Sequence, residues 1–347
     1  MLAVRDTRPT RPTPHRRGMS TPKTVLGVDG GQSSTTAAIC DLSGRLLGIG
    51  RAGPSNHVWE PGGVARARRA VSGSVREALR AAGLRSAVFE AAFFGMTGGK
   101  ARGRIADICQ RCVSAERLRV DNDQVNALAS VTLGQPGIVV IAGTGTITYG
   151  ENARGQSASA SGWGWLLGDE GSGFWIARQA IAAACRARDG RAEPTLLADS
   201  LLTAAGVRDL WDLHFLIYSE KLSRADIASL AAVVPPAAAK GDAAARRVLR
   251  DAARELGLAA GVVAERLGMH RGRLVVGMVG GVFRGSREVR AAFRREVRKH
   301  AAKAAFVEAR FAPVIGSVLL ALRMAGVKLT PEVLANLDAA SAAIGAK

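Results

Sequence analysis

Apolar runs followed by glycine-rich turns occur twice along this chain, in the same arrangement. The run 25–28 leads into a turn over 29–35, and the run 138–142 leads into a turn over 143–146. Each turn is followed by a second strand-like segment. Glycine permits close backbone approach to a ligand, and Ser and Thr hydroxyls add donors. The pattern predicts two strand–turn–strand units that hold phosphate oxygens from both sides of a cleft, as in an ATP site.

The remaining pattern alternates helices and strands. In the first half it predicts helices over 63–82, 102–117 and 124–133, and strands over 87–94 and 117–120. This order predicts a mixed sheet with helices on both sides. The second half adds a strand over 273–279 and an apolar helix from about 314 to Met324, and the densest basic stretch, Arg284 to Arg310, predicts a helix with a solvated face.

Chain length and composition indicate a two-domain α/β protein. The chain has 347 residues, enough for two sizeable cores. We place a disordered basic extension at 1–21, an N-terminal domain at 22–137, a C-terminal domain at 138–313, and a C-terminal helix and tail at 314–347 that returns toward the first domain. Met19 is an alternative start, and a transit peptide is an alternative interpretation of the extension.

Charge and cysteine usage exclude some classes of function. The net charge is +19, but arginine is spread along the chain and aromatic residues make up only 5%. Without a base-stacking platform we expect no specific nucleic-acid binding. No apolar run is long enough for a membrane span, so we expect no membrane partner and a cytoplasmic protein. Cys109 and Cys112 form a C-x-x-C without a second pair, which favours ordinary reduced thiols over a metal site.

Three carboxylates stand at chemically suggestive places. The chain lacks a P-loop, a dinucleotide fingerprint and a zinc-protease motif. Asp29 ends its strand before the first turn, where it either holds hydrated Mg²⁺ beside a triphosphate or accepts turn N–H groups. Asp123 is either a helix cap or a general base for phosphoryl transfer. Asp169, in a Gly- and Trp-rich segment before a helix, predicts a loop that grips a polyhydroxylated ligand.

These motifs resemble those of the BadF/BadG/BcrA/BcrD ATPase family, and most closely its N-acetylglucosamine kinase branch within the sugar kinase–actin–Hsp70 superfamily. The resemblance covers about residues 24–326 and rests on segments 27–31, 142–146 and 162–172, in that order. It implies two ribonuclease-H-like domains closing over ATP, with Mg²⁺, and an amino sugar. It also implies a homodimer.

The resemblance assigns roles to individual residues. Asp123 would be the catalytic base for the sugar 6-hydroxyl. For Asp29 we favour the metal role, from its place before the first turn and the matching turn at 143–146. The substrate-binding residues would be Asn56, Thr97, Gly162, Gly164 and Asp169. The nucleotide-binding residues would be Gly30, Gly31, Gln32, Ser33, Ser34, Thr35, Thr144, Gly145, Gly280 and Gly281. The predicted function is therefore an ATP-dependent kinase of N-acetylglucosamine or glucosamine.

One departure and two alternatives accompany this prediction. The family's first turn usually continues Gly-Thr-Lys-Thr, whereas this chain has Gln32-Ser33-Ser34-Thr35 and so loses a glycine and a lysine. The same family contains ATP-dependent activators of 2-hydroxyacyl-CoA dehydratases and benzoyl-CoA reductase subunits, to which Cys109 and Cys112 could point. A non-catalytic sugar sensor is the other alternative. The sugar-type loop at 162–172, Asn56 and the retained carboxylates favour the kinase.

Overall fold

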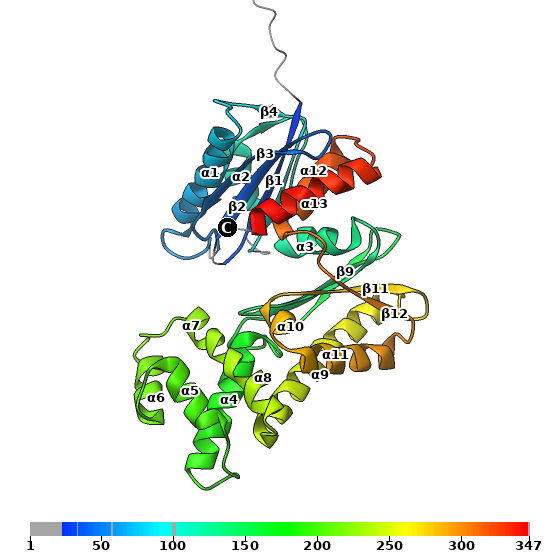
Figure 1. Cartoon of the computed structure of the whole chain (residues 1–347). Helices are drawn as coiled ribbons and strands as arrows, with labels where there is room; N and C mark the ends of the chain where they lie inside the picture. Colours follow the sequence, from blue (N-terminus) through cyan, green and yellow to red (C-terminus); the bar gives the residue numbers. More distant parts are fainter. Residues whose placement is uncertain (1–22, 33, 57, 99–101, 346–347) are drawn as a thin grey trace, which may run out of the picture.

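The chain folds into two α/β lobes (Figure 1). The computed structural model describes residues 23–345 except Ser33, His57 and residues 99–101. The predicted disorder of the N-terminal extension and the predicted role of Ser33 therefore lie outside the described residues. Figure 1 shows the last two helices returning to the lobe that contains the first strands.

The N-terminal lobe is built on a five-stranded mixed sheet. Its strands, in chain order, are β1 (Thr24–Gly30), β2 (Thr35–Asp41), β3 (Leu46–Ala52), β5 (Ala91–Met96) and β7 (Leu118–Asp121). They lie in the order β3-β2-β1-β5-β7, with β1 antiparallel to β2 and parallel to β5. A short parallel pair, β4 (Val88–Phe89) and β6 (Ser114–Ala115), stands apart from this sheet.

The C-terminal lobe repeats this sheet with the same connections. Its strands, in chain order, are β8 (Gly137–Ala142), β9 (Thr146–Glu151), β10 (Ser157–Ala160), β11 (Leu274–Val279) and β12 (Ala304–Glu308). They lie in the order β10-β9-β8-β11-β12, with β8 antiparallel to β9 and parallel to β11. The central strand of each sheet therefore ends at one of the two glycine-rich turns. The predicted repeat of one strand–turn–strand unit is confirmed.

Five helices cover the N-terminal sheet. They are α1 (Gly63–Ala81), α2 (Arg102–Cys112), α3 (Asp123–Thr132), α12 (Pro313–Met324) and α13 (Pro331–Gly345). Helix α12 packs on β1 and on α3, and its core side chains join those of β1 and β5. At Gly316 the two helices approach so closely that a Cβ atom would lie 2.1 Å from the Asn126 carbonyl oxygen. Only glycine permits this contact, which brings α3 against α12.

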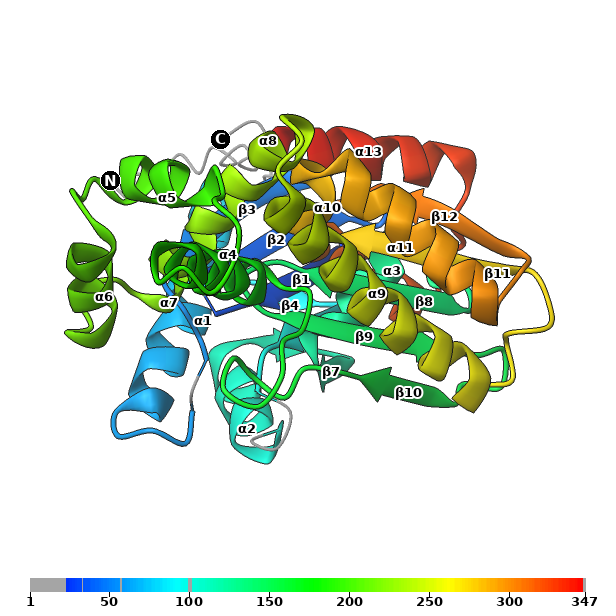
Figure 2. The same cartoon turned by 90° about the horizontal axis from the view of Figure 1, so that it is seen from below.

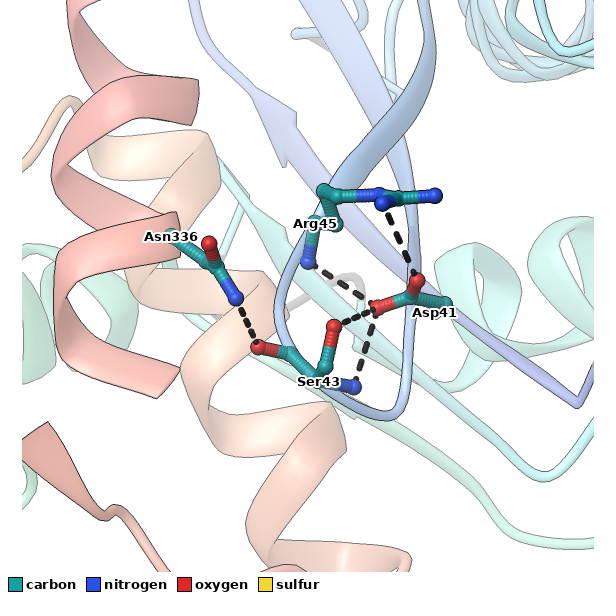
Figure 3. A network of polar contacts seen from close by, with 4 residues as sticks. All are labelled: Asp41, Ser43, Arg45 and Asn336. Atoms are coloured by element: carbon teal, nitrogen blue, oxygen red, sulfur yellow. Dashed lines mark hydrogen bonds and ion pairs between the residues drawn. The ribbon is translucent and has the colours of Figure 1, made fainter. Parts of the chain in front are cut away.

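The C-terminal helix α13 is fastened to the turn between β2 and β3 (Figure 3). Within that turn, Oδ1 of Asp41 accepts hydrogen bonds from the backbone N–H and hydroxyl of Ser43 and from the backbone N–H of Arg45. The Asn336 amide of α13 then donates a 2.9 Å hydrogen bond to the Ser43 carbonyl oxygen. A buried Leu337 beside it adds apolar contact with the same lobe.

Helices in the C-terminal lobe lie on its sheet and extend beyond it (Figure 2). They are α4 (Gly173–Arg188), α5 (Leu197–Ala205), α6 (Leu210–Tyr218), α7 (Arg224–Ser229), α8 (Val234–Ala239), α9 (Ala243–Arg266), α10 (Gly281–Gly285) and α11 (Arg287–His300), with a 3₁₀ turn at Leu230–Val233. The long helix α9 packs against α11 and the sheet. Ser172 caps α4 by accepting from the Trp175 backbone N–H.

Two predicted helices are shorter than expected. The helix predicted over 102–117 ends at Cys112, and β6 begins two residues later. In the basic stretch, α10 ends at Gly285, α11 covers Arg287–His300, and β12 follows at Ala304–Glu308. The apolar segment of β12 explains this, because Phe306 packs against Phe293 and is covered by the Arg298 guanidinium, 5.2 Å from its ring centre.

The described part of the chain bears on two predictions, that Cys109 is an ordinary thiol and that no helix spans a membrane. Cys109 is fully buried in the core between α1, α2 and the sheet, and burial raises the pKa of its thiol well above the usual range. A buried, protonated thiol is inert, which agrees with a structural role for Cys109. No described helix is both long and apolar enough to cross a membrane.

Candidate active site

A cavity of about 800 Å³ opens between the two lobes. Both glycine-rich turns, the end of β5, the start of α3 and the loop before α4 contribute to its walls. Nine of the predicted site residues line it: Gln32, Asn56, Thr97, Asp123, Thr144, Gly145, Gly162, Gly164 and Asp169. Residues predicted from six separate stretches of sequence thus converge on one space, large enough for a sugar and part of a nucleotide.

A second cavity of about 500 Å³ adjoins the first within the C-terminal lobe. Its walls are mainly apolar, with Ile176, Leu249 and Val289 among them, and predicted nucleotide-binding Gly281 lines it. The two cavities share Gly143, Thr144 and Ala225. An apolar space beside a polar one, separated by a glycine-rich turn, suits a ligand with an aromatic base and a phosphate chain.

Asp123 and Thr97 form the polar centre of the larger cavity. Asp123 is the first residue of α3, and the Thr97 hydroxyl, just after β5, donates a hydrogen bond to its carboxylate. Burial raises the pKa of Asp123, while this bond and the N–H groups at the helix start oppose the rise. A carboxylate with a raised pKa that lines a cavity is suited to accept a proton from a ligand hydroxyl.

Asp29 lies just behind this centre, at the end of β1. The Asn126 amide of α3 donates a 2.8 Å hydrogen bond to its Oδ1 atom. Burial raises the pKa of Asp29 to about 7; the Asn126 hydrogen bond opposes this rise, and the negative charge of Asp123 adds to it. The charge of Asp123 thus disfavours ionisation of Asp29, and a nearby cation would stabilise both carboxylates as anions.

The residues around Asp29 fit a magnesium ion carried with a nucleotide. Mg²⁺ is commonly held by one or two carboxylates together with phosphates and waters. Among the described residues there is no group of three or more His, Cys, Asp or Glu side chains that could hold a metal. Asp29 and Asp123 are the carboxylates that could serve such a metal here.

Asp169 fixes the loop 162–172 against the second glycine-rich turn. Its Oδ1 atom accepts a 3.3 Å hydrogen bond from the Thr146 backbone N–H. A Cβ atom on Gly145 would lie 2.8 Å from Asp169 Oδ2, so a larger residue there would displace the Asp169 carboxylate. Burial raises the pKa of Asp169, and the Thr146 bond and the Arg224 charge oppose the rise. The loop and the turn thus form one wall of the cavity.

Several predicted nucleotide-binding residues do not line either cavity. They shape the first turn and its surroundings instead. The Gly31 backbone N–H donates a hydrogen bond to the Ser34 carbonyl oxygen. The Thr35 hydroxyl donates to the Gly53 carbonyl oxygen. The Gly30 carbonyl oxygen accepts a hydrogen bond from the Thr97 backbone N–H. Gly280 packs against the backbone of Ala142. Their ligand contacts remain predictions.

Some residues of the site were absent from the sequence-based set. Asn126 is fully buried and holds Asp29, and its polar side chain within an apolar helix was a usable signal. Arg224 lines the larger cavity from α7, in a region whose sequence shows only a helical pattern. Trp163 lines the cavity too, whereas Trp175 packs in the core of the C-terminal lobe.

Comparison with known proteins agrees with this geometry. The model of the BadF/BadG/BcrA/BcrD ATPase family matches residues 26–321, a span that includes both turns and both cavities. The chain belongs to this family. Membership in this ATPase family implies the use of ATP, and the predicted resemblance is confirmed.

Proteins similar in sequence to this chain include named sugar kinases. The chain is 33% identical over 302 residues to an N-acetylmuramic acid/N-acetylglucosamine kinase of Clostridium acetobutylicum, covering 86% of this chain and 98% of that protein. It is 28% identical over 257 residues to an N-acetyl-D-glucosamine kinase of Dictyostelium discoideum, covering 71% of this chain and 81% of that protein.

A solved structure has the same two-lobed α/β architecture. It is that of a proposed N-acetylglucosamine kinase from Chromobacterium violaceum, with a TM-score of 0.69 and 27% sequence identity. The match covers 87% of this chain and 99% of that one. The predicted fold class, two similar α/β domains around a cleft, is therefore confirmed.

Proposed function

We propose that the protein is an ATP-dependent kinase that phosphorylates an amino sugar, N-acetylglucosamine or glucosamine, at the 6-hydroxyl. The observation that carries the proposal is the junction of the two cavities at Gly143 and Thr144, with Asp123 lining the larger one. This arrangement suits a nucleotide on one side of the turn and a hydroxyl acceptor on the other. The names of the relatives support an amino sugar as the acceptor.

Asp123 acts in this mechanism as the general base. Its carboxylate accepts the proton of the 6-hydroxyl while that oxygen attacks the terminal phosphate of ATP. The Thr97 hydrogen bond orients the carboxylate toward the acceptor and helps keep it ionised. Asn56, Asp169, Gly162 and Gly164 line the same cavity and form the sugar-binding wall.

The two turns position the phosphates. Thr144 and Gly145 contribute from the C-terminal lobe, and Gln32 contributes from the N-terminal lobe. Asp29 is the residue that would hold Mg²⁺, which supplies positive charge to the phosphates when bound. Because the turns belong to different lobes, closure of the cleft brings acceptor and donor into line and excludes water.

The decisive experiment is an ADP-release assay with a panel of sugars. Purified protein with ATP and Mg²⁺ is supplied with glucosamine, N-acetylglucosamine, N-acetylmannosamine, N-acetylmuramate or glucose. We expect release only with amino sugars and a product whose phosphorus couples to the protons on C6 in NMR. ATP hydrolysis that is independent of every sugar in the panel would contradict the proposal.

We also propose a cytoplasmic homodimer. The resemblance to N-acetylglucosamine kinases supports the dimer, and the use of ATP as a substrate supports the compartment. Sedimentation velocity of the full chain measures the first property, and fractionation of cells expressing it measures the second. A monomer at micromolar concentration would contradict the assembly without affecting the proposed reaction.

A further inference from the structure

Arg224 makes a polar contact across the cleft between the two lobes. It is the first residue of α7, and its guanidinium donates a hydrogen bond to Oε1 of Gln32 in the first glycine-rich turn. The two residues are 192 positions apart in the sequence. Since an amide oxygen is a neutral acceptor, this hydrogen bond does not neutralise the guanidinium charge.

The charge of Arg224 is unusual for its surroundings. Among the described residues that line the larger cavity, it is the only basic one, while Asp123 and Asp169 line the same space. Asp29 adds a third carboxylate behind them. A phosphate chain entering this cavity meets negative groups on several sides, so binding it requires positive charge in the walls as well as on a metal ion.

The place of Arg224 coincides with the junction of the two cavities. The next residue, Ala225, lines both cavities together with Gly143 and Thr144. A nucleotide whose base lies in the apolar cavity must pass its terminal phosphate along this junction to reach Asp123. Arg224 therefore stands beside the end of the phosphate chain rather than beside its beginning.

We propose that Arg224 binds the terminal phosphate of ATP, exchanging its contact with Gln32 for phosphate oxygens. The inference rests on the ATP site of the proposed function. A guanidinium offers a planar pair of donors that matches two phosphate oxygens, and charge-assisted hydrogen bonds are stronger than bonds to a neutral amide. The Gln32 contact holds the side chain at the cleft until the phosphate replaces it.

The test compares binding of a triphosphate analogue with binding of ADP. Isothermal titration calorimetry measures Kd for AMPPNP and for ADP, both with Mg²⁺ and without sugar, in the wild type, Arg224→Gln and Arg224→Lys. The matched control is Arg208→Gln, whose side chain is 92% exposed, pairs with Asp212 and lines neither cavity. Thermal melting shows that each variant is folded.

We expect Arg224→Gln to weaken AMPPNP binding about 10- to 100-fold, the range for loss of charged hydrogen bonds, and to leave ADP binding within about two-fold. Arg224→Lys keeps the charge but not the planar pair of donors. Its Kd for AMPPNP should lie between those of the wild type and Arg224→Gln. Arg208→Gln should match the wild type for both nucleotides. The ratio of the two dissociation constants is thus the quantity that identifies a terminal-phosphate contact.

Other results would overturn the inference. Equal weakening of AMPPNP and ADP by Arg224→Gln would indicate a general or structural effect. An unchanged ratio, combined with a KM of Arg224→Gln that rises for N-acetylmuramate but not for N-acetylglucosamine, would assign Arg224 to an acidic sugar instead. Because the titration contains no sugar, failure of sugar phosphorylation would remove the kinase proposal without touching this result.

Discussion

The side-chain amide of Asn126 donates a 2.8 Å hydrogen bond to Oδ1 of Asp29 and a 3.2 Å hydrogen bond to the Pro313 carbonyl oxygen. One buried amide thereby connects the end of β1, the helix α3 and the start of α12. It also fixes Asp29 beside Asp123 in a place where ionisation of Asp29 is unfavourable. The local chemistry of the site therefore opposes the stability of the ligand-free protein.

Asp29→Asn should stabilise the ligand-free protein at alkaline pH. In the unfolded chain an aspartate loses its proton near pH 4, whereas Asp29 in the folded protein does so near pH 7, with a pKa of about 7. Between these values the folded state holds the extra proton, so stability falls as pH rises. Asp29→Asn has no carboxylate to ionise at this position and so lacks this pH-dependent loss of stability.

The measurement is thermal melting of the wild type and Asp29→Asn at pH 5 and pH 8 without nucleotide. We expect the variant to gain a few degrees relative to the wild type at pH 8, on the order of 2 °C for each kcal/mol. The gain should be smaller at pH 5. Melting curves that differ by the same amount at both pH values would contradict the raised pKa of Asp29.

Asp123→Asn should lower kcat by about 10²- to 10⁴-fold, the usual contribution of a general base. The fold should survive, because the change is nearly isosteric and removes a carboxylate whose pKa is raised by burial. Asp121→Asn is the matched control, since Asp121 pairs with Arg119 and does not line the larger cavity. Steady-state kinetics with saturating sugar and ATP would measure kcat of both variants. Equal kcat values for the wild type and Asp123→Asn would show that Asp123 is not the general base.

Thr97→Val should move the acidic limb of the kcat profile to higher pH. The Thr97 hydroxyl bond lowers the pKa of Asp123, so its removal raises that pKa, and a base must be ionised to accept a proton. Activity should therefore fall most at low pH and recover as pH rises. Thr97→Ser retains the hydroxyl and should keep the wild-type limb. A uniform loss at every pH would indicate that Thr97 only shapes the cavity.

Gly143→Ala tests whether the second turn needs space for a ligand. A Cβ atom on Gly143 would meet no heavy atom within 4 Å, and the same holds for Gly272, which lies outside both cavities. Both alanine variants should melt close to the wild type. Only Gly143→Ala should raise KM for ATP, by about ten-fold if one phosphate hydrogen bond is lost. Equal KM values in the two variants would place the phosphates elsewhere.

Leu337→Ala should destabilise the protein without altering the site. Leu337 is fully buried in the core that α13 shares with the N-terminal sheet, and such a truncation costs about 2–5 kcal/mol. Denaturant unfolding should show the loss, while KM for both substrates stays near the wild-type values. Leu334→Ala, partly buried on the same helix, should cost less. A change in KM for the sugar would reveal coupling between α13 and the cleft.

The hydrophobic pattern predicted the repeated sheets because strands and turns are local. The turns at 29–35 and 143–146, the strand β11 and the helix α12 all follow from short-range periodicity and glycine placement. The pattern was wrong for 304–308, which form a strand after the basic helix ends at His300. There the decisive contact is between Phe306 and Phe293, on different elements, which sequence periodicity does not contain.

Residues of the candidate site could be predicted where they belong to a sequence motif. Residues that reach the site only through tertiary packing could not. Asp123, Asp169 and Thr144 stand at element ends marked by glycines or polar runs. Arg224 stands in an ordinary helical stretch and reaches the cleft only because α7 lies across from the first turn. Conversely, Thr35 belongs to a suggestive turn, yet its hydroxyl is used by the Gly53 carbonyl group.

The return of α12 and α13 to the first lobe has a consequence for biosynthesis. Buried residues of β1 and β5, such as Val25 and Phe93, share their core with Val318 and Leu319 near the other end of the chain. While a ribosome is still translating the second lobe, that face of the first sheet is covered only in part, by α3, and lacks α12 and α13. The lobe made first is therefore completed last, and its nascent sheet offers an apolar face to chaperones or to aggregation until the final helices emerge.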